Sequence, residues 1–408
     1  MKKYIFWLGC WALAACDISD NKIEVLDRFV RIYDNATFNR AFTPVDIQQT
    51  PDGGYLILGE TEISDAVFPG IYLMKVDAEG NFLFDQILPG DYAFPVGDLM
   101  RVGEQYYFFC LQPVSLIAHL VSVDAGGQVG TPIPIADDEG NPVYYPMHAS
   151  LINSNEMLLL GYDKDNQESV LTRLNLSGTV QQKRAYSIGI GGDVDEVEEP
   201  IINHFTRNGR KFPFLTGVGA GGQVFFNGFY NFTFSFVLTN LGNEDEPAVL
   251  QGVADGAGLS AALFLENNTY ATARFSFGQN YILPQADIQV GPGNPGSSED
   301  LGGNTFPELN PNATIKLKRL SLAGRDVLLY ASDTRAGQII LLAYDTVSGQ
   351  LIGSTYLGFT NPYEVASFVK TADEGLAVVG TTYVAGRFPR ICLFKLNADE
   401  VGQLLSGN

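Results

Sequence analysis

The chain has 408 residues and a formal net charge of −21, from 46 acidic and 25 basic residues. Hydrophobic residues make up 46% of it, aromatic residues 12% and charged residues only 17%. This composition excludes a disordered chain, and the acidic balance excludes a protein that binds nucleic acid through a basic surface. A chain of this length often forms two or three domains, but a large all-β architecture can use several hundred residues in one domain.

The first sixteen residues have the three parts of a secretory signal peptide. Two lysines precede an apolar run from Tyr4 to Leu13, which is too short to span a membrane, and small residues follow it. The ending Leu13-Ala14-Ala15-Cys16 resembles the bacterial lipobox. This resemblance implies that Cys16 is acylated and becomes the first residue of the mature protein. The alternative is an ordinary signal peptide in which Cys16 is incidental.

We therefore expect a signal peptide over residues 1–15, a lipidated cysteine with its tether over 16–22, and a single domain over 23–408. Asp17 directly follows the cysteine. An acidic residue there resembles the inner-membrane retention signal of enterobacteria and also the surface-export signal of Bacteroidota. The repeats described next favour the second setting, so the predicted location is the outer membrane, lipid-anchored and facing outward.

A strand with no repeat of its own, Arg28–Tyr33, precedes a repeat of about fifty residues that organises the chain after residue 40. The clearest copy runs from Asp46 to Gly90, where apolar, β-branched and aromatic segments are separated by Pro-Asp-Gly-Gly and Asp-Ala-Glu-Gly. These are turn sequences, so the unit predicts four consecutive strands. A second clear copy occupies residues 369–400, and degenerate copies lie between the two.

The end of the second strand serves as a marker for the phase of the repeat. It recurs seven times, at Gly59, Cys110, Gly161, Gly217, near Arg274, at Ala331 and at Gly380. Seven four-stranded units of this length predict an all-β fold, a seven-bladed β-propeller, with six or eight blades as the alternatives. The last unit has little room for a fourth strand, so we expect Arg28–Tyr33 to complete it and close the ring.

Three features of the repeat also resemble a known family. They are the Asp-Gly-Gly-Tyr turn at residues 52–55, the Gly-x-Thr after it, and the Lys-x-Asp-x-x-Gly at residues 75–80. They resemble the repeats of secreted and lipoprotein β-propellers of Bacteroidota. The resemblance implies blades and a location in the cell envelope, but it implies no substrate.

Two cysteines remain once Cys10 leaves with the signal peptide and Cys16 is lipidated. Cys110 and Cys392 each lie in an apolar strand-like run, so we expect buried free thiols. A disulfide between them is the alternative in an oxidising compartment.

Two stretches rich in turn formers and acids, Gly189–Pro200 and Gly291–Asn312, are predicted to be long surface loops. The first contains Asp193, Asp195 and Glu196, whose carboxylates are candidate calcium ligands. Their spacing matches no known calcium-loop signature, so a solvated acidic loop is the main expectation. We predict no metal and no cofactor.

The candidate catalytic residues lie near the predicted start of the innermost strand of four units, twelve or thirteen residues before the phase marker. They are Asp46, Asp98, His148 and His204. Imidazoles beside carboxylates at the mouth of a channel can bind a metal or act as acid and base. The alternative is that they only cap inner strands around a wet channel. Three tyrosines near unit junctions, Tyr144, Tyr145 and Tyr363, are candidates for stacking on sugar rings, and the alternative is that they pack in the core or the rim.

Two short motifs match catalytic signatures only formally. Gly217–Gly222 contains G-x-G-x-x-G, but a strand-like segment follows it where a dinucleotide site needs a helix. Ser367–Lys370 matches S-x-x-K, but in a strand the two side chains point to opposite faces. We therefore predict a non-enzymatic binding or scaffold module for a glycan, a peptide or an envelope protein, with no nucleic acid partner. The alternative is a glycan-active hydrolase or lyase that uses carboxylates and histidines at the channel mouth.

Overall fold

The computed structural model describes residues 27–34, 40–243, 245–384 and 388–407. Cys16, the predicted signal peptide and the whole of the predicted tether lie outside these ranges. Nearly all regular structure in the described part is β-strand, with two α-helices, α1 (Val194–Phe205) and α2 (Ala398–Leu404). Neither helix is long and apolar enough to cross a membrane.

The strands of the first half of the chain form three antiparallel meanders of four strands each. The first two meanders are joined by a single pair, Gly70 and Ala93. Their strands are β2 (Phe42–Gln49), β3 (Tyr55–Thr61), β4 (Gly70–Val76) and β5 (Phe82–Ile87); β6 (Ala93–Val102), β7 (Gln105–Leu111), β8 (Ala118–Asp124) and β9 (Ile133–Pro134); and β10 (His148–Asn153), β11 (Glu156–Asp163), β12 (Glu168–Asn175) and β13 (Val180–Ser187).

Four further sheets follow the same pattern in the second half. A short strand, β21 (Gly296–Ser297), pairs in parallel with the outer edge of the first of them. The strands are β14 (Leu215–Val218), β15 (Val224–Tyr230), β16 (Thr233–Thr239) and β17 (Ala248–Gln251); β18 (Ala257–Glu266), β19 (Thr269–Ser276), β20 (Gln279–Asp287) and β22 (Asn304–Thr305); β23 (Ile315–Leu322), β24 (Arg325–Asp333), β25 (Ile339–Asp345) and β26 (Leu351–Leu357); and β27 (Tyr363–Lys370), β28 (Leu376–Thr382), β29 (Arg390–Leu396) and β1 (Phe29–Tyr33).

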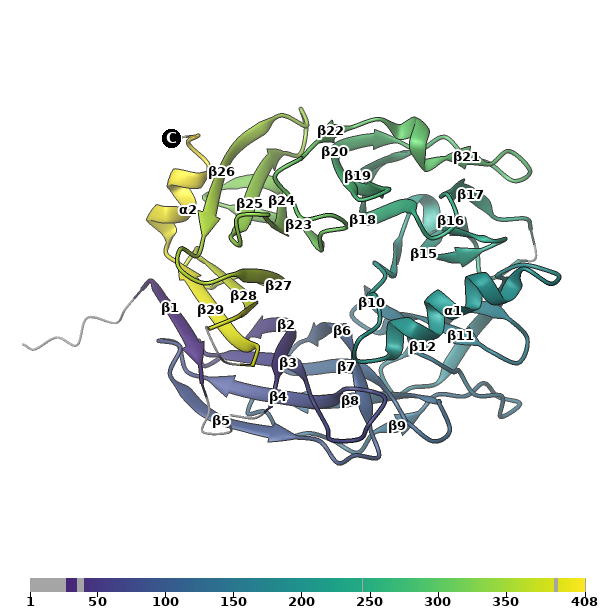
Figure 1. Ribbon diagram of the computed structural model, residues 1–408, viewed down its shortest axis with the longest axis horizontal. Coiled ribbons are helices and arrows are strands. Elements are labelled where there is room, and N and C mark those ends of the chain that lie inside the picture. The colour runs from purple at the N-terminus through teal and green to yellow at the C-terminus, as the bar shows by residue number, and fades with distance from the viewer. Residues whose placement is uncertain (1–26, 35–39, 244, 385–387, 408) are drawn as a thin grey trace, which may run out of the picture.

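The sheets stand side by side around a central axis, each with its first strand innermost (Figure 1). The first strand of each sheet contacts the first strand of the next, and β27 lies against β2. Four-stranded sheets repeated radially are the architecture of a β-propeller. The prediction of an all-β, repetitive, propeller-type fold is therefore confirmed.

The N-terminal strand β1 pairs antiparallel with β29, so that Phe29 faces Lys395 and Tyr33 faces Ile391. It is the fourth strand of the last sheet, as its lack of a repeat predicted. The chain does not supply this strand from its C-terminal end because it turns into α2 directly after β29. A capping box between Asn397 and Glu400 starts that helix.

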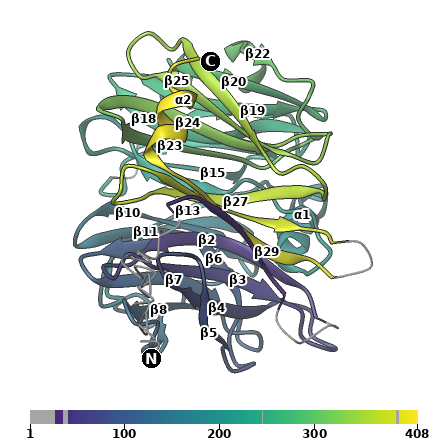
Figure 2. The same cartoon turned by 90° about the vertical axis from the view of Figure 1, so that its left-hand side faces the viewer.

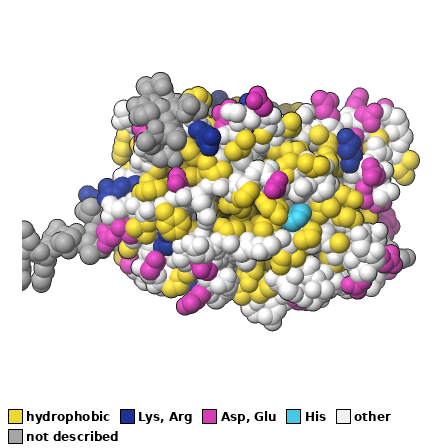
Figure 3. Space-filling view, turned by 90° about the horizontal axis from the view of Figure 1, so that it is seen from below, with side chains coloured by type: hydrophobic (Ala, Val, Ile, Leu, Met, Phe, Trp, Pro, Cys, Tyr) yellow, Lys and Arg dark blue, Asp and Glu magenta, His cyan; other side chains and the backbone are white. Residues whose placement is uncertain are grey.

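The core lies between neighbouring sheets, which explains the runs of apolar residues in the middle strands. Every residue of β4, β28 and β29 is buried, because both faces of these strands are covered. The outer strands are half exposed; Phe82, Leu83 and Ile87 of β5 are accessible. Figure 3 views the side of the molecule where β5 and β9 lie and shows many hydrophobic side chains there, with acidic and basic side chains scattered between them.

The prediction of a loop over Gly189–Pro200 was wrong, because α1 begins inside it. Val194, Val197 and Ile201 recur at helical spacing and are buried, while the acids between them face solvent. The turn-like glycines at residues 189–192 and the acidic residues hid this short amphipathic pattern. Gly291–Asn312 also contains more structure than predicted, namely β21, a 3-10 turn over Ser298–Leu301 and β22.

The strand directions place the connections on two faces of the ring. The hairpins between first and second strands and between third and fourth strands share one face, which we call the turn face. The connections from second to third strands and from one sheet to the next share the other, which we call the α1 face because one of them carries α1. In the side view of Figure 2, α1 and α2 lie toward opposite faces.

Cys110 and Cys392 are free and buried, in β7 and β29. Burial raises the pKa of both thiols. The alternative of a disulfide between them is therefore not realised.

Candidate functional site

A cavity of about 710 Å³ occupies the centre of the ring. The first strand of every sheet contributes to its lining, mostly with residues of its first half, such as Thr43, Phe94 and His148. First strands start on the α1 face, so the cavity lies toward that face. This volume is within the usual range for sites that bind small ligands.

His148, the first residue of β10, lies in the cavity wall as predicted. Its Nδ1 accepts the backbone N–H of Thr216 at 3.1 Å and lies 3.1 Å from the Thr216 hydroxyl. Because Nδ1 is an acceptor, the neutral ring carries its proton on Nε2. Burial lowers the pKa of His148 to about 4; Asp98 opposes this effect and Lys316 adds to it. The ring is therefore neutral at pH 7.

Asp98 lies near His148 in the cavity, so the structure brings two of the four predicted residues together. Burial by itself would raise the pKa of the Asp98 carboxyl, but His148, Lys318 and Lys316 together hold the pKa below its usual value. Since His148 is neutral at pH 7, the two lysines are the cations that stabilise the carboxylate there. Among the residues that the structure describes, none donates a hydrogen bond to the Asp98 side chain.

The two lysines come from β23 and, being two residues apart, point to the same side of the strand. The ammonium group of Lys318 has its partners within the protein. Its Nζ donates to the Phe368 carbonyl at 2.7 Å and the Ser367 hydroxyl at 3.2 Å, and lies 3.8 Å from Asp46. Lys316 lines the cavity and, within the described ranges, forms no hydrogen bond or ion pair.

Asp46 occupies an inner strand as predicted, but it is not part of the cavity lining. Its side chain is only 1% exposed, and Oδ2 accepts the backbone N–H of Leu99 in the next sheet at 2.7 Å. This carboxylate fastens β2 to β6.

His204 was predicted at the start of an inner strand, and this prediction was wrong because the residue lies near the end of α1. Its ring packs against Phe94, Phe205 and Phe214, with centroid distances of 5.5, 5.4 and 4.8 Å. Nδ1 accepts the Phe212 N–H at 2.8 Å. Burial keeps the pKa of His204 well below its usual value, and Lys211 adds to this. The residue is a neutral packing group at the cavity wall.

Two further acids lie in the lining, Asp333 and Glu364. The sequence pattern had placed Glu364 somewhat upstream of the candidate position in the last unit, whereas Asp333 was not among the candidates. Asp333 ends β24, is buried, and accepts the backbone N–H of Val365. Burial raises the pKa of Asp333 to about 7; the Val365 N–H opposes this, Glu364 adds to it and Lys316 opposes it. Glu364 is exposed and accepts a hydrogen bond from the Tyr383 hydroxyl at 3.1 Å.

The only sequence signal for Asp333 was an acid at the end of an apolar strand. Asp163 shows the same pattern at the end of β11, where its Oδ1 caps a surface turn by accepting N–H groups of Asp165 and Asn166. The pattern alone therefore does not separate a cavity acid from a turn acid.

The three candidate calcium ligands lie at the start of α1, with Asp193 at the N-cap and Asp195 and Glu196 in the first turn. Acids in that position stabilise the helix through its dipole. In the described part of the chain, no three His, Cys, Asp or Glu residues are grouped so that they could hold a metal ion.

The other sequence motifs resolve into structural features. Tyr145 and Tyr363 are buried in the core and are not available for stacking on a sugar. The G-x-G-x-x-G stretch runs from β14 through a 3-10 turn, Ala220–Gly222, into β15, so no α-helix follows it.

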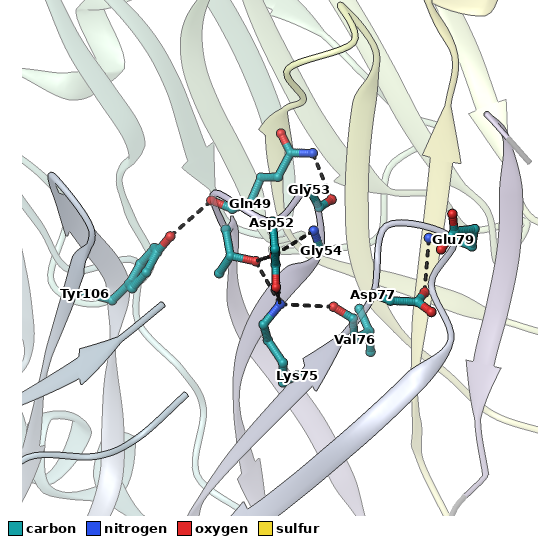
Figure 4. A network of polar contacts seen from close by, with 10 residues as sticks. Gln49, Asp52, Gly53, Gly54, Lys75, Val76, Asp77, Glu79 and Tyr106 are labelled. Atoms are coloured by element: carbon teal, nitrogen blue, oxygen red, sulfur yellow. Dashed lines mark hydrogen bonds and ion pairs between the residues drawn. The ribbon is translucent and has the colours of Figure 1, made fainter. Parts of the chain in front are cut away.

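The family-like motif of the repeat forms a polar network on the turn face (Figure 4). Lys75 is buried; its Nζ donates to Thr50 at 2.9 Å and to Asp52 at 2.8 Å, and Asp52 also accepts the Gly54 N–H. Lys395 contacts Asp373 at 2.9 Å in the last sheet in the same way. The motif therefore fastens the first hairpin of a sheet to its third strand, and its role is structural.

The α1 face carries apolar side chains at the tips of its loops. Phe359 is 92% exposed and Phe277 is 73% exposed. The other exposed apolar residues on loops of this face are Val67, Val114, Ile190, Val253 and Phe388. Val347 is an exposed apolar residue on a turn-face loop. Exposed apolar loop residues are therefore concentrated on the face toward which the cavity lies, although none of them lines the cavity itself.

No protein-family model and no curated protein matches the chain. Solved structures that resemble it include the β-propeller domain of the Trilobed protease from Pyrococcus furiosus, with 8% identity, a TM-score of 0.44, and coverage of 90% of this chain and 98% of that one. A protein of unknown function from Dyadobacter fermentans matches with 13% identity and a TM-score of 0.41, over 90% and 99% of the two chains. At these TM-scores, the likenesses carry no argument about ligand or activity.

Proposed function

We propose that the protein is a binding module whose ligand, a glycan, a peptide or a segment of an envelope protein, enters the central cavity from the α1 face. The observation that carries this proposal is the cavity of about 710 Å³, lined by charged and apolar groups from every first strand. The exposed apolar loop residues of the α1 face support the proposal, since exposed apolar groups gathered on one face are typical of interaction surfaces.

The scaffold in this proposal is a closed ring of seven blades. The pairing of β1 with β29 and the contact of β27 with β2 support closure, because together they leave no gap between the last and first sheets. A ring closed by both chain ends keeps the cavity wall rigid, and rigid walls reduce the entropy lost when a ligand binds.

Binding without catalysis is supported by how the predicted catalytic residues are used. His148 is held through Nδ1 by Thr216, His204 is packed among aromatic rings, and Asp46 is bonded to a backbone N–H. Within the described residues, no hydroxyl is hydrogen-bonded to His204 or Asp46. The Nδ1 of His148 lies 3.1 Å from the Thr216 hydroxyl, but it also accepts the Thr216 N–H, which makes it less available as a base toward that hydroxyl.

The alternative, a glycan-active hydrolase or lyase, is favoured by one observation. Asp333, with a pKa raised by burial to about 7, is close enough to the exposed Glu364 for the two carboxyls to interact. One carboxyl that holds a proton near neutral pH beside another is the arrangement of a general acid and base.

The test uses the mature chain with Cys16→Ser on an array of polysaccharides and peptides, beside a variant with a blocked cavity. Thr314 lies at the cavity and is exposed, so Thr314→Trp fills the mouth. Ser321→Trp is the control because Ser321 is exposed on β23, the strand that begins directly after Thr314, and lies outside the cavity lining. We expect Thr314→Trp to weaken binding of any array ligand at least tenfold and the control to leave it unchanged.

Equal binding by both variants would place the ligand elsewhere and contradict the proposal. A ligand that is consumed over time by the unblocked protein, and not by Asp333→Asn, would support the enzyme instead.

We further propose that the module is a lipoprotein of the outer membrane, anchored through Cys16 and facing outward. The described chain begins at Asp27, which accepts a hydrogen bond from Asn397 beside the start of α2, toward the turn face. The eleven residues from Cys16 to Leu26 span at most about 40 Å when extended. An anchor joined to this side leaves the α1 face free to meet a ligand.

Cys16→Ser tests the anchor. We expect the variant to move from the membrane fraction to the soluble fraction, because one thiol carries the lipid attachment. Labelling of the wild-type protein on intact cells with a membrane-impermeant reagent then checks the outward orientation. Unchanged membrane association of Cys16→Ser would refute the lipid anchor.

A further inference from the structure

Two opposite charges share the cavity without touching. Asp98 and Lys316 are close enough for the lysine to stabilise the carboxylate, yet no ion pair within 4.0 Å joins them. Lys318 on the same strand shows the contrast, because its ammonium is bound by Phe368 and Ser367. The protein therefore satisfies one lysine with its own atoms and leaves the other facing the cavity.

Partly buried charges are costly when they have lost water and gained no partner. Asp98 and Lys316 are both only partly exposed in the cavity wall. A neutral hydroxyl supplies a hydrogen bond to either group but no countercharge. A ligand that carries an ammonium and a carboxylate supplies both a hydrogen bond and a countercharge to each.

We propose that the cavity binds a short zwitterionic ligand, an amino acid or short peptide with free ends, whose ammonium pairs with Asp98 and whose carboxylate pairs with Lys316. This inference rests on the proposed function, because it requires the cavity to be a ligand site. It names the chemical class of the ligand, which the shape of the cavity does not.

Neighbouring groups fit this class. His148 is neutral with its proton on Nε2, so it is an uncharged donor beside the charge pair and does not compete with Lys316 as a cation. Glu364 is a second carboxylate, exposed at the mouth, which favours entry of the ammonium end. Phe214 and Phe264 line the same cavity and provide apolar wall for the side chains of a peptide.

The experiment measures binding of trialanine by calorimetry to the mature chain with Cys16→Ser. Matched probes are trialanine acetylated at its amino end, trialanine amidated at its carboxyl end, and maltotriose as a neutral polyol. We expect free trialanine to bind at least tenfold more tightly than either blocked form, since each block removes one charge-assisted contact.

Two substitutions assign the ends of the ligand. Lys316→Met should lower the affinity for trialanine at least tenfold. It should leave the affinity for the amidated form unchanged, because that form lacks the carboxylate. Asp98→Asn should weaken trialanine in the same way and leave the acetylated form unchanged. Lys370→Met is the matched control, because Lys370 lies outside the cavity and pairs with Glu374.

Equal affinity for free and blocked trialanine, or no binding of trialanine at millimolar concentration, would overturn the inference. If maltotriose binds and Thr314→Trp abolishes this binding, the inference of a zwitterionic ligand is overturned, while the proposed binding function stands. If Thr314→Trp also leaves every array ligand bound, the proposed function itself fails. Melting temperatures of Lys316→Met and Asp98→Asn equal to that of the parent chain would show that any lost binding is not unfolding.

Discussion

The molecule contains two kinds of lysine–aspartate pair. One kind stabilises the fold, and the other leaves its charges open to the cavity. On the turn face, the Nζ of Lys75 contacts Asp52 at 2.8 Å and also donates to the Thr50 hydroxyl. In the cavity, Lys316 and Asp98 interact through space but have no contact with each other. A charge that is satisfied by its own chain holds the fold together, whereas one left unsatisfied in a cavity is available to a ligand.

The turn-face pair is repeated and the cavity pair is not. Lys395 and Asp373 reproduce the Lys75 network in the last sheet, as part of the motif that the repeat carries. Asp98 comes from the second sheet and Lys316 from the sixth. The cavity pair is therefore formed between two sheets and is not part of the motif that recurs within each sheet. Four changes test whether the two pairs differ in this way.

The largest effect is expected from deletion of residues 23–34, which removes the strand beside the Lys395 network. Phe29 of β1 is buried and β1 covers the edge of β29, so the deletion empties part of the core and exposes a strand edge. We expect the free energy of unfolding to fall by about 5 kcal/mol or more. Urea unfolding measures it, with deletion of residues 17–22 as the control; an unaltered midpoint would argue against closure of the ring by β1.

Asp333→Asn tests a third kind of charged group, a buried acid that has a backbone partner but no cation in contact. Burial raises the pKa of Asp333 from 3.8 to about 7, so the folded state holds a proton that the unfolded state releases. The stability linked to this proton is complete below pH 3.8 and is lost as the pH rises through 7. Asparagine stays uncharged, so the variant should lack this loss.

We expect the free energy of unfolding of Asp333→Asn to rise relative to that of the wild-type protein by about 1 kcal/mol per pH unit between pH 4 and pH 7. Urea unfolding at several pH values measures the difference. Asp326→Asn, at an exposed carboxylate paired with Arg319, is the control and should follow the wild-type curve. Parallel curves for Asp333→Asn and the wild-type protein would contradict the raised pKa.

Lys75→Met breaks the satisfied pair. Methionine keeps much of the side-chain volume but leaves the Thr50 hydroxyl, the Asp52 carboxylate and the Val76 carbonyl without their common donor. We expect a loss of about 2 kcal/mol in the free energy of unfolding. Lys370→Met, which breaks a surface pair, should cost less than about 0.5 kcal/mol. Equal effects of the two substitutions would show that burial of Lys75 adds nothing.

Lys316→Met is expected to have the smallest effect on stability. Its ammonium has no bonded partner in the described part of the chain, so its removal should change the free energy of unfolding by less than about 0.5 kcal/mol. Thermal unfolding measures this. A loss of stability as large as that of Lys75→Met would mean that Lys316 stabilises the fold, as Lys75 does, and is not held free for a ligand.

Much of the fold could be predicted because its information is local. The turn sequences at residues 51–54 and 77–80 and the apolar strands between them recur, so the strand pattern of one unit transfers to the others. The same register predicted Asp98 and His148 near the starts of inner strands. His148 begins β10, whereas Asp98 is the sixth residue of β6, and the two lie near each other in the cavity. The α1 segment was missed because a single helix inserted between units has no repeat to reveal it.

The rest of the site depends on contacts between sheets, which the repeat does not encode. Lys316 stands in a run with Lys318 and Arg319 that resembles a solvated strand. Which of the two lysines is free depends on Ser367 and Phe368 of the next sheet. Likewise, Asp333 is buried only because β27 lies over it and offers the Val365 N–H.

The pairing of β1 with β29 also determines how the protein bears load. A pull on the chain before Asp27 acts on β1, which is held along five facing residue pairs from Phe29 to Tyr33. Force therefore reaches the outer edge of one sheet first, and the inner strands that form the cavity wall lie three strands away from it. A force applied at this end of the chain therefore separates β1 from β29 before it reaches the inner strand β27, which contributes to the cavity wall.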